Sequence, residues 1–407
     1  MKAYARSIGL DLIGVASAEP FLEEKARLER RQAEGKGPNP YEPQEIAPRI
    51  YPEQLLPGVQ AIVAAGISYL QPEDHDGGTG PGKAVKAEGL SRLPPSGASS
   101  GAGEAAQRPA LRGWLSRYCR GQDYHPLLKE KLSQVAAWLE AQVPGTRTLV
   151  HVDTGPPLER AIAERAGIGK FGKHTNLITP QYGTWVFLGE ILTDLPLPPD
   201  QPAEAACGSC TLCIDACPTQ CLTEWNLDAN RCLSYITQMK GIIPVEYREV
   251  MGSRLFGCDE CQTVCPYNRR ARPGLHPEFA PQPEVGAEPD LLQIMNMTKS
   301  DFRRWFEPTA AGWRGKTTLQ RNAIIALGNS GDPAAFEPLA RSLRSESQVI
   351  RAHAAWALGR LARQAPDLML QARRLLTQRR AVEQDPAVQL EIETALEALE
   401  ALKGSDS

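Results

Sequence analysis

The sequence predicts an α+β protein built from three successive parts, and three observations carry this prediction. Apolar strand patterns and helical patterns are mixed through the first part of the chain, a cysteine-rich segment follows, and two similar helical segments occur near the end. Proline-rich stretches separate the parts, so we expect domains at residues 1–198, 199–275 and 290–403. At 407 residues the chain is long enough for each part to bury a core.

The first part is predicted to be an α/β domain. Residues 21–32 form a charged helical run, and helical spacing also covers residues 114–142. Residues 71–108 are rich in Gly, Pro, Ser and Ala without a sustained apolar period, so we predict a flexible insertion there. Buried or strand-like patterns lie at residues 59–69, 146–152, 175–179 and 184–193.

The cysteine-rich segment carries the most specific signal. Three cysteines separated by two residues are followed by a fourth that precedes proline, a run that resembles bacterial ferredoxins with two [4Fe–4S] clusters. A second copy lacks one cysteine, for which Cys232 is the natural replacement. In ferredoxins the last cysteine of each run crosses to the other cluster. Carried onto this chain, the ligand sets are Cys207, Cys210, Cys213 and Cys265 for one cluster, and Cys217, Cys232, Cys258 and Cys261 for the other.

Zinc ribbons and a disulfide framework are the alternatives for these cysteines. Zinc sites normally use isolated Cys-x-x-Cys pairs, and a reducing compartment opposes disulfides. We see no secretory signal and no apolar segment of membrane-spanning length, so we expect a cytoplasmic protein without membrane contact. Cys119 and Cys221 are left over, and each is interpreted as a buried thiol.

A glycine-rich basic loop follows the helix that Pro156 and Pro157 are expected to open. Gly167-x-x-x-x-Gly172-Lys173-His174 nearly spells a phosphate-binding loop, but His174 replaces the hydroxyl residue and the element order is wrong. We therefore do not expect nucleotide triphosphate binding. A cationic loop of this kind can still hold another anionic or amide-bearing group.

Asp153 stands at the end of the strand pattern at residues 146–152. It is placed either to cap the next helix or to act as an acid catalyst in a pocket, and the sequence leaves both interpretations open. Asp123-Tyr124-His125, at the start of a helix, is ambiguous in the same way.

The C-terminal part combines a repeat with a charge excess. Residues 320–328 and 351–359 resemble each other, and a weaker third copy lies at residues 388–399, which predicts HEAT-like helical repeats. Residues 303–380 contain 14 lysines and arginines against 5 acids, a net charge of +9, although the whole chain is at −3. This basic segment suggests a polyanionic partner such as nucleic acid, or else a solvated helix face.

Taken together, these features resemble the epoxyqueuosine reductases, which are cobalamin-dependent iron–sulfur enzymes of queuosine maturation in tRNA. One of the matching motifs is Val-Asp-Thr-Gly-Pro-Pro-Leu-Glu-Arg at residues 152–160. The long insertion and the acidic C-terminus depart from the family pattern. The other motifs lie at residues 55–58, 116–125, 166–174, 187–190, 231–235, 257–262 and 321–328, together with the cysteine groups.

The resemblance implies a reaction and its cofactors. The expected reaction reduces epoxyqueuosine to queuosine at the wobble position of tRNA, with electrons passing from two [4Fe–4S] clusters to cobalamin. Asp153 matches the family's proton donor, for which burial should raise the pKa, and Lys240 lies where the family approaches tRNA. The residues expected to line the cobalamin are Arg49, Ser116, Asp153, Lys173, Leu177, Ser234 and Asp259.

The resemblance also implies partners. We expect a monomer that binds a tRNA anticodon stem-loop carrying epoxyqueuosine and takes electrons from an external reductant. Two other functions compete with this one. A reductive dehalogenase shares the plan of a corrinoid with two clusters, but has no use for a basic helical tail. A ferredoxin-type electron carrier would leave the residues before the clusters without a task.

Overall fold

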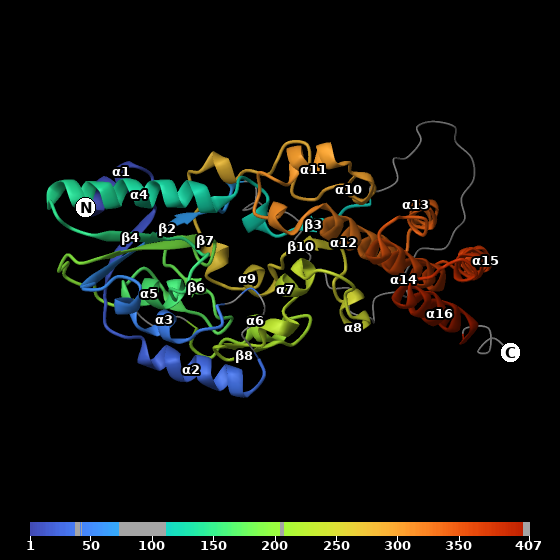
Figure 1. Ribbon diagram of the computed structural model, residues 1–407, viewed down its shortest axis with the longest axis horizontal. Helices are drawn as coiled ribbons and strands as arrows, with labels where there is room; N and C mark the ends of the chain where they lie inside the picture. The colour runs from blue at the N-terminus through green and yellow to red at the C-terminus, as the bar shows by residue number, and fades with distance from the viewer. Residues whose placement is uncertain (37–40, 42, 73–110, 204–206, 402–407) are drawn as a thin grey trace.

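A computed structural model describes residues 1–36, 41, 43–72, 111–203 and 207–401. The chain runs along the long axis of the molecule, from a sheet near the N-terminus at one end to stacked helices at the other (Figure 1). Of the predicted insertion, only Gln71 and Pro72 belong to the described residues. Gln71 is buried and donates hydrogen bonds to the carbonyl oxygens of Tyr69 and His276.

A four-stranded antiparallel sheet organises the N-terminal part. Its strand order is β1-β2-β7-β4, so the entirely buried β2 lies inside the sheet between β1 and β7. The strands predicted at residues 59–69, 146–152 and 184–193 are confirmed as β2, β4 and β7. The bounds are β1 Leu12–Ser17, β2 Ala61–Ser68, β4 Thr148–His151 and β7 Val186–Thr193.

Helices cover both faces of this sheet, and each face has its own apolar core (Figure 1). Val63 and Ile67 belong to the core beneath α1 and α4, whereas Ile62 and Ala64 belong to the core beneath α5. This is the alternation that a strand buried on both faces requires. The bounds are α1 Lys2–Ser7, α2 Leu22–Ala33, α3 Ala47–Ile50, η1 Pro52–Gln54, α4 Tyr124–Gln142 and α5 Glu159–Arg165.

The helix predicted over residues 114–142 begins later than expected. Asp123 caps α4 by accepting a hydrogen bond from the backbone N–H of His125, so the helix starts at Tyr124. Upstream, β3 (Trp114–Leu115) pairs in parallel with β10 (Arg254–Phe256), and η3 (Arg117–Cys119) follows it. This long-range pairing overrides the helical spacing, and it ties the first part to the cysteine region.

Short elements surround the cysteines in the middle of the chain. α6 (Leu212–Asp215) and α9 (Glu260–Thr263) pack against each other, and each contains one cysteine. Most other elements here span only two or three residues, so loops position the thiols. The bounds are β5 Lys170–Phe171, β6 Leu177–Ile178, β8 Leu222–Thr223, β9 Asn226–Leu227, η4 Ala229–Arg231, α7 Leu233–Gln238, α8 Val245–Arg248, η5 Asn268–Arg270 and η6 Pro277–Phe279.

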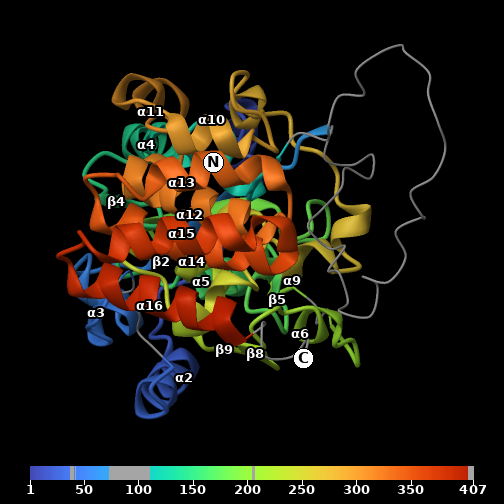
Figure 2. The same ribbon diagram turned by 90° about the vertical axis from the view of Figure 1, so that its right-hand side faces the viewer.

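The C-terminal part is a stack of helices, which Figure 2 shows from its outer end. α14 packs against both α12 and α16, so the weak third copy predicted at residues 388–399 is a genuine helix of the stack. The bounds are α10 Leu291–Asn296, α11 Lys299–Trp305, η7 Gly312–Arg314, α12 Lys316–Asn329, η8 Pro333–Ala335, α13 Phe336–Ser342, α14 Gln348–Gln364, η9 Pro366–Leu368, α15 Met369–Arg380 and α16 Pro386–Ala401.

Small residues allow these helices to approach closely. A Cβ atom at Gly328 would lie 2.8 Å from Cα of Ala357, and one at Gly359 would lie 3.0 Å from Cβ of Ala395. These contacts join α12 to α14 and α14 to α16. The glycines of the two sequence repeats therefore lie at helix–helix contacts, as the repeat pattern predicts.

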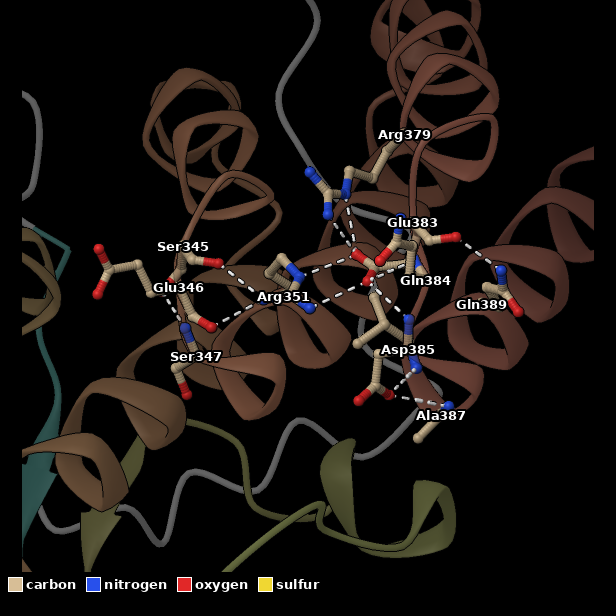
Figure 3. A network of polar contacts seen from close by, with 11 residues as sticks. Ser345, Glu346, Ser347, Arg351, Arg379, Glu383, Gln384, Asp385, Ala387 and Gln389 are labelled. Carbon is tan, nitrogen blue, oxygen red and sulfur yellow. Dashed lines mark hydrogen bonds and ion pairs between the residues drawn. The ribbon is translucent and has the colours of Figure 1, made fainter.

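A buried carboxylate organises the turn before α16 (Figure 3). Glu383 accepts hydrogen bonds from Arg351 and Arg379 and from the backbone N–H groups of Gln384 and Asp385. The Arg351 guanidinium is the main cause that lowers the pKa of Glu383 to about 2. Arg351 and Arg379, two cations of the basic segment, are therefore paired with a carboxylate of the fold.

The helical stack and part of the cysteine region share one core. Leu233 and Phe256 belong to the same apolar cluster as the buried faces of α12, α14 and α16. Asn322, fully buried on α12, donates hydrogen bonds from its side chain to the carbonyl oxygens of Thr237 and Leu255. Among the helices that the structure describes, none is long and apolar enough to cross a membrane.

Candidate functional site

The structure brings the cysteines together in two groups. One cavity, of about 40 Å³, is lined by all four thiols of the first predicted set, and His174 and Tyr267 also line it. α6 and α9 bring together the residues that surround it, because Cys213 lies in α6 and Cys265 follows α9. The first predicted ligand set is Cys207, Cys210, Cys213 and Cys265.

A second cavity, of about 230 Å³, is lined by the other four predicted thiols. Its cysteines come from both runs and from the turn before α7, so the last cysteine of each run crosses to the other group, as the ferredoxin pattern predicts. One more thiol, that of Cys221, also lines this cavity. The second predicted ligand set is Cys217, Cys232, Cys258 and Cys261.

The thiols at both cavities are matched to a cationic occupant. Burial is the main cause that raises the pKa of Cys213 and of Cys258 to about 11, and it also raises the pKa of Cys261. Iron binds the thiolate, so a bound cluster must supply the positive charge that holds these groups deprotonated.

His174 lies between the two cavities and lines both of them. Its Nδ1 accepts a hydrogen bond from the backbone N–H of Asn176 at 3.2 Å, so Nε2 carries the proton. Among the described residues this buried Nε2–H has no acceptor. Burial lowers the pKa of His174 to about 4, which keeps the ring neutral. An inward-facing N–H without an acceptor fits clusters whose sulfur atoms accept hydrogen bonds.

His174 explains why glycine stands at position 172 of the near phosphate-binding loop. A Cβ atom at Gly172 would lie 2.5 Å from the His174 ring, so glycine is required for the ring to lie where it does. Lys173 does not face a phosphate either. Its Nζ is 2.6 Å from the carboxylate of Glu224, and its backbone N–H donates to Sγ of Cys207 at 3.3 Å.

Three neighbouring cavities, which share the side chain of Arg160, extend from the second thiol group to the N-terminal sheet. Tyr118, Leu177, Phe187 and Leu188 line them, together with amide groups such as Asn176 and Gln262. Apolar and aromatic walls with a few amides fit a broad ring system that carries amide side chains, which is the chemistry of a corrinoid.

Most of the residues predicted to line the cobalamin border these cavities. Of the three cavities that share Arg160, one is lined by Arg49 and Asp153. The cavity of the second thiol group is lined by Ser116 and Ser234, and the cavity beside the N-terminal sheet by Leu177. Two of the predicted residues do not line them and are placed differently in the structure.

Asp259 is one of these two residues. It is buried against the backbone, and it accepts hydrogen bonds from Ser116 Oγ at 2.5 Å and from the Arg117 N–H at 2.9 Å. It therefore holds the turn that presents Ser116 to the second cavity. Lys173 is the other, since it lies beside Cys207 and Glu224.

Asp153 lies in the loop after β4 and lines the cavity that Arg49 and Arg160 also line. Its φ of +52° is in the left-handed region, which aspartate tolerates better than most residues. The interpretation of Asp153 as the cap of α5 is wrong, because Leu158 flanks the start of that helix. The same observation corrects the expected helix start at Pro156, since α5 begins at Glu159.

The Asp153 carboxylate contacts two side chains from the start of α4. Its Oδ2 accepts a hydrogen bond from the Tyr124 hydroxyl at 2.7 Å and lies 3.1 Å from Nε2 of His125. The other ring nitrogen of His125 is 2.6 Å from the Asp123 carboxylate. The histidine thus lies between two acids, and the Asp123-Tyr124-His125 motif belongs to the site.

These contacts set the protonation states. Burial opposes charge on both partners, but the hydrogen bonds to Asp123 and Asp153 raise the pKa of His125 to about 9. Desolvation acts to raise the pKa of Asp153, whose side chain is half exposed, but the hydrogen bonds from His125 and Tyr124 outweigh it and lower the pKa. The expectation that burial raises the pKa of Asp153 is therefore wrong for this conformation. At neutral pH the proton is on His125 and the charge is on Asp153.

Two further carboxyls lie behind Asp153. Glu159, at the start of α5, accepts a hydrogen bond from the backbone N–H of Asp153, and burial raises its pKa to about 8. Burial also raises the pKa of Glu190, in the middle of β7, well above its ordinary value. Both residues belong to motifs found in the sequence. Only for Glu190 does the sequence indicate burial, because this glutamate stands inside the apolar pattern of β7.

Lys240 is exposed in the loop after α7, beside an aromatic surface. The carbonyl oxygen of Gln238 accepts hydrogen bonds from the Tyr41 hydroxyl and from Nε of Arg314. The Arg314 guanidinium also lies over the rings of Tyr41 and Trp313, at 4.8 and 4.4 Å from their centroids. Trp313 is 56% exposed, so part of its ring is open to solvent beside the Arg314 guanidinium.

Fold and site together define a redox protein with two adjacent iron–sulfur sites, neighbouring cavities lined by apolar, aromatic and amide groups, and a helical-repeat tail. Three family models match the chain. The model of the epoxyqueuosine reductase QueG, DUF1730, matches residues 98–154, the 4Fe-4S double cluster binding domain matches residues 206–268, and HEAT repeats match residues 315–397. The predictions of two iron–sulfur clusters and of HEAT-like repeats are therefore confirmed.

The similarity to known proteins extends over nearly the whole chain. An epoxyqueuosine reductase from Bacillus cereus is 39% identical over 361 residues, which cover 88% of this chain and 87% of that protein. A crystal structure of epoxyqueuosine reductase with a tRNA-Tyr epoxyqueuosine-modified stem loop matches with a TM-score of 0.83 and 37% identity, covering 98% of this chain and 97% of that one. A structure of epoxyqueuosine reductase from Bacillus subtilis, with its catalytic loop swung out of the active site, matches with a TM-score of 0.83 and 36% identity. This match covers 98% of this chain and 97% of that one.

The chain belongs to the epoxyqueuosine reductase family and is an oxidoreductase. The resemblance found in the sequence motifs is confirmed, and so is the α+β fold class.

The position of His174 leads to a first prediction. His174→Phe should keep both clusters but lower the reduction potential of at least one of them, on the order of tens of millivolts, because a donor to sulfur is lost. Redox titration followed by electron paramagnetic resonance measures this shift. His151→Phe is the matched control, since its Nε2 is also buried without a partner among the described residues but lies outside the thiol cavities. Equal potentials in both variants would show that the His174 N–H faces no cluster.

Proposed function

We propose that this enzyme reduces epoxyqueuosine to queuosine at the wobble position of tRNA. The observation that carries this function is the arrangement of two thiol groups, neighbouring cavities lined by apolar, aromatic and amide groups, and the Asp153–His125 pair, whose carboxylate lines one of these cavities. The related structure that holds an epoxyqueuosine-modified stem loop supports the same substrate. Family membership favours this function over a dehalogenase or an electron carrier.

The reaction takes up two electrons and two protons, breaks both carbon–oxygen bonds of the epoxide and releases water. We propose an external reductant as the source of the electrons, which the two clusters would carry to cobalamin when these groups are bound. Cobalamin, when bound, supplies the reducing metal atom. Arg49, Ser116, Leu177 and Ser234 would contact it, because their side chains border the cavities. The enzyme is proposed to act as a cytoplasmic monomer, with the domain limits predicted from the sequence.

Asp153 is proposed as the residue that donates a proton to the departing oxygen, and His125 as the residue that supplies it. Asp153 is ionised in the resting contact with His125, so it has no proton to give until one is transferred. The two groups are 3.1 Å apart, and the pKa of His125 keeps its proton in place at neutral pH. Proton transfer between them needs no rearrangement of the fold.

Movement of the Asp153 loop completes this proposal. The Asp153 side chain is held at α4 by its contacts with Tyr124 and His125, and its backbone has a left-handed φ of +52°. The related structure with its catalytic loop swung out supports a loop that moves. Leaving His125 separates the carboxyl from the cation that lowers its pKa, so a proton acquired there is retained more easily.

Asp153→Asn should keep both clusters and the affinity for tRNA but lose about 10²-fold or more in turnover, because a carboxamide cannot donate this proton. A single-turnover assay on tRNA carrying epoxyqueuosine measures the rate. Asp194→Asn, at an exposed ion pair with Arg147, serves as the control and should leave turnover unchanged. Near-normal product formation by Asp153→Asn would exclude Asp153 as the donor.

Turnover should also fall as pH rises through about 9. The pKa of His125 is raised, so the histidine is protonated below that pH and loses its proton above it. A rate profile between pH 6 and pH 10 tests this, with about a tenfold loss expected per pH unit above the pKa. In His125→Asn this alkaline limb should disappear. An identical limb in that variant would assign the titration to another group.

The tRNA is proposed to bind across Lys240 and the Tyr41–Trp313–Arg314 surface. An open aromatic face stacks with an unpaired base, and the neighbouring cations attract phosphates. Much of the basic segment does not contribute to this surface, since Arg360 and Arg363 pair with Glu249 and Arg373 pairs with Glu400. Glu249 and Glu400 lie outside residues 303–380, so these ion pairs offset part of the positive charge counted for that segment.

Lys240→Ala should weaken binding of a tRNA anticodon stem-loop and reduce the slope of log affinity against log salt by about 1, as expected for one lost phosphate contact. Fluorescence anisotropy at several salt concentrations measures both. Lys25→Ala, which removes an exposed lysine paired with Glu29 on α2, is the control for the loss of one charge. If both variants changed the slope equally, Lys240 would contribute only general electrostatics.

A further inference from the structure

The second thiol cavity contains one cysteine more than a cluster needs. Cys221 follows a tight turn in which Gln220 has a φ of +49° and donates its N–H to the carbonyl oxygen of Cys217 at 3.0 Å. This turn brings Sγ of Cys221 to 3.4 Å from Sγ of Cys217. The thiol of Cys221 therefore contacts a predicted iron ligand.

Cys221 also contacts a second predicted ligand. It is 6% exposed and belongs to a compact cluster that includes Cys217, Cys232 and Cys261. Its thiol hydrogen-bonds with that of Cys217, and Cys232 packs against the same cluster. The backbone fixes this position, because the carbonyl oxygen of Cys221 accepts a hydrogen bond from the Asp228 N–H at 2.9 Å.

The geometry excludes five simultaneous ligands. Each terminal sulfur of a [4Fe–4S] cube binds a different iron, so two ligand sulfurs in van der Waals contact do not serve two separate corners. Cys217 and Cys221 are in such contact, at 3.4 Å. Cys221 therefore either stays unligated or takes the corner of one of the two thiols that it touches.

We propose that Cys221 is a reserve ligand of the second cluster, able to bind the iron vacated by Cys232 or Cys217. The exchange is not a redox step. The Cys221 thiol loses its proton and forms the new iron–sulfur bond, while the departing thiolate breaks its bond and takes up a proton. This inference rests on the proposed ligand set, in which Cys232 holds the fourth corner.

Cluster content measures this exchange without any assay of turnover. Chains are purified anaerobically, and iron and acid-labile sulfide are counted per chain, with visible absorption as a second readout. Two four-iron clusters give about eight irons in the wild type. We expect about eight irons also in Cys221→Ala and in Cys232→Ala, but about four in the double variant Cys221→Ala/Cys232→Ala.

A matched control separates ligand exchange from general damage. Cys119→Ala/Cys232→Ala also removes a second buried thiol, but Cys119 lies outside both cavities and should leave about eight irons. Circular dichroism shows whether each variant retains its helices. The pair Cys217→Ala and Cys217→Ala/Cys221→Ala repeats the test at the other corner, should a Cys232 variant fail to fold.

Two results would overturn the proposal. If Cys232→Ala alone contained as few irons as the double variant, Cys221 would not replace it. If Cys221→Ala alone lost a cluster, Cys221 would be a resident ligand and not a reserve. Fewer than eight irons in the wild type would instead contradict the two-cluster assignment on which the proposed function rests.

Discussion

Sulfur ligands must give up their protons before they can bind iron, and burial in this protein opposes that step. The pKa of Cys213 and of Cys258 is raised to about 11, because their surroundings disfavour an isolated charge. Only a cationic cluster offsets this cost, so the folded cysteine region and its metal depend on each other. The one-turn helices, the crossing of the two runs and the N–H groups of Lys173 and His174 are arranged around that constraint.

The parts of this arrangement that follow local rules were predictable. Cysteine spacing predicts which thiols share a cavity because the turn between near neighbours determines their direction. The strand pattern at residues 59–69 predicts β2, and repeated glycines predict the contacts of α12 with α14 and of α14 with α16. Within each run residues close in sequence carry this information, whereas the crossing of Cys217 and Cys265 between the groups followed from the resemblance to ferredoxins.

The parts that depend on distant contacts were not predictable. Asp153 is ionised because His125, 28 residues earlier in the chain, donates to it, and no local pattern reports that pairing. Residues 114–115 leave the predicted helix because β10 pairs with them. Cys221 resembles any buried thiol until the left-handed Gln220 brings its sulfur against Cys217. The sequence contains these residues, but only the fold defines their neighbours.

The shared core also bears on how such a protein can change during evolution. The side-chain amide of Asn322 donates hydrogen bonds to two carbonyl oxygens of the cysteine region. Apolar residues of the helical stack and of the cysteine region belong to one core. Repeat domains are commonly exchanged as cassettes, since each repeat contacts mainly its neighbours. Here α12 also packs against α7 and β10 of the cysteine region through this shared core. Glu391 of α16 also pairs with the buried Arg248 of α8, so both ends of the stack must evolve together with the iron–sulfur region.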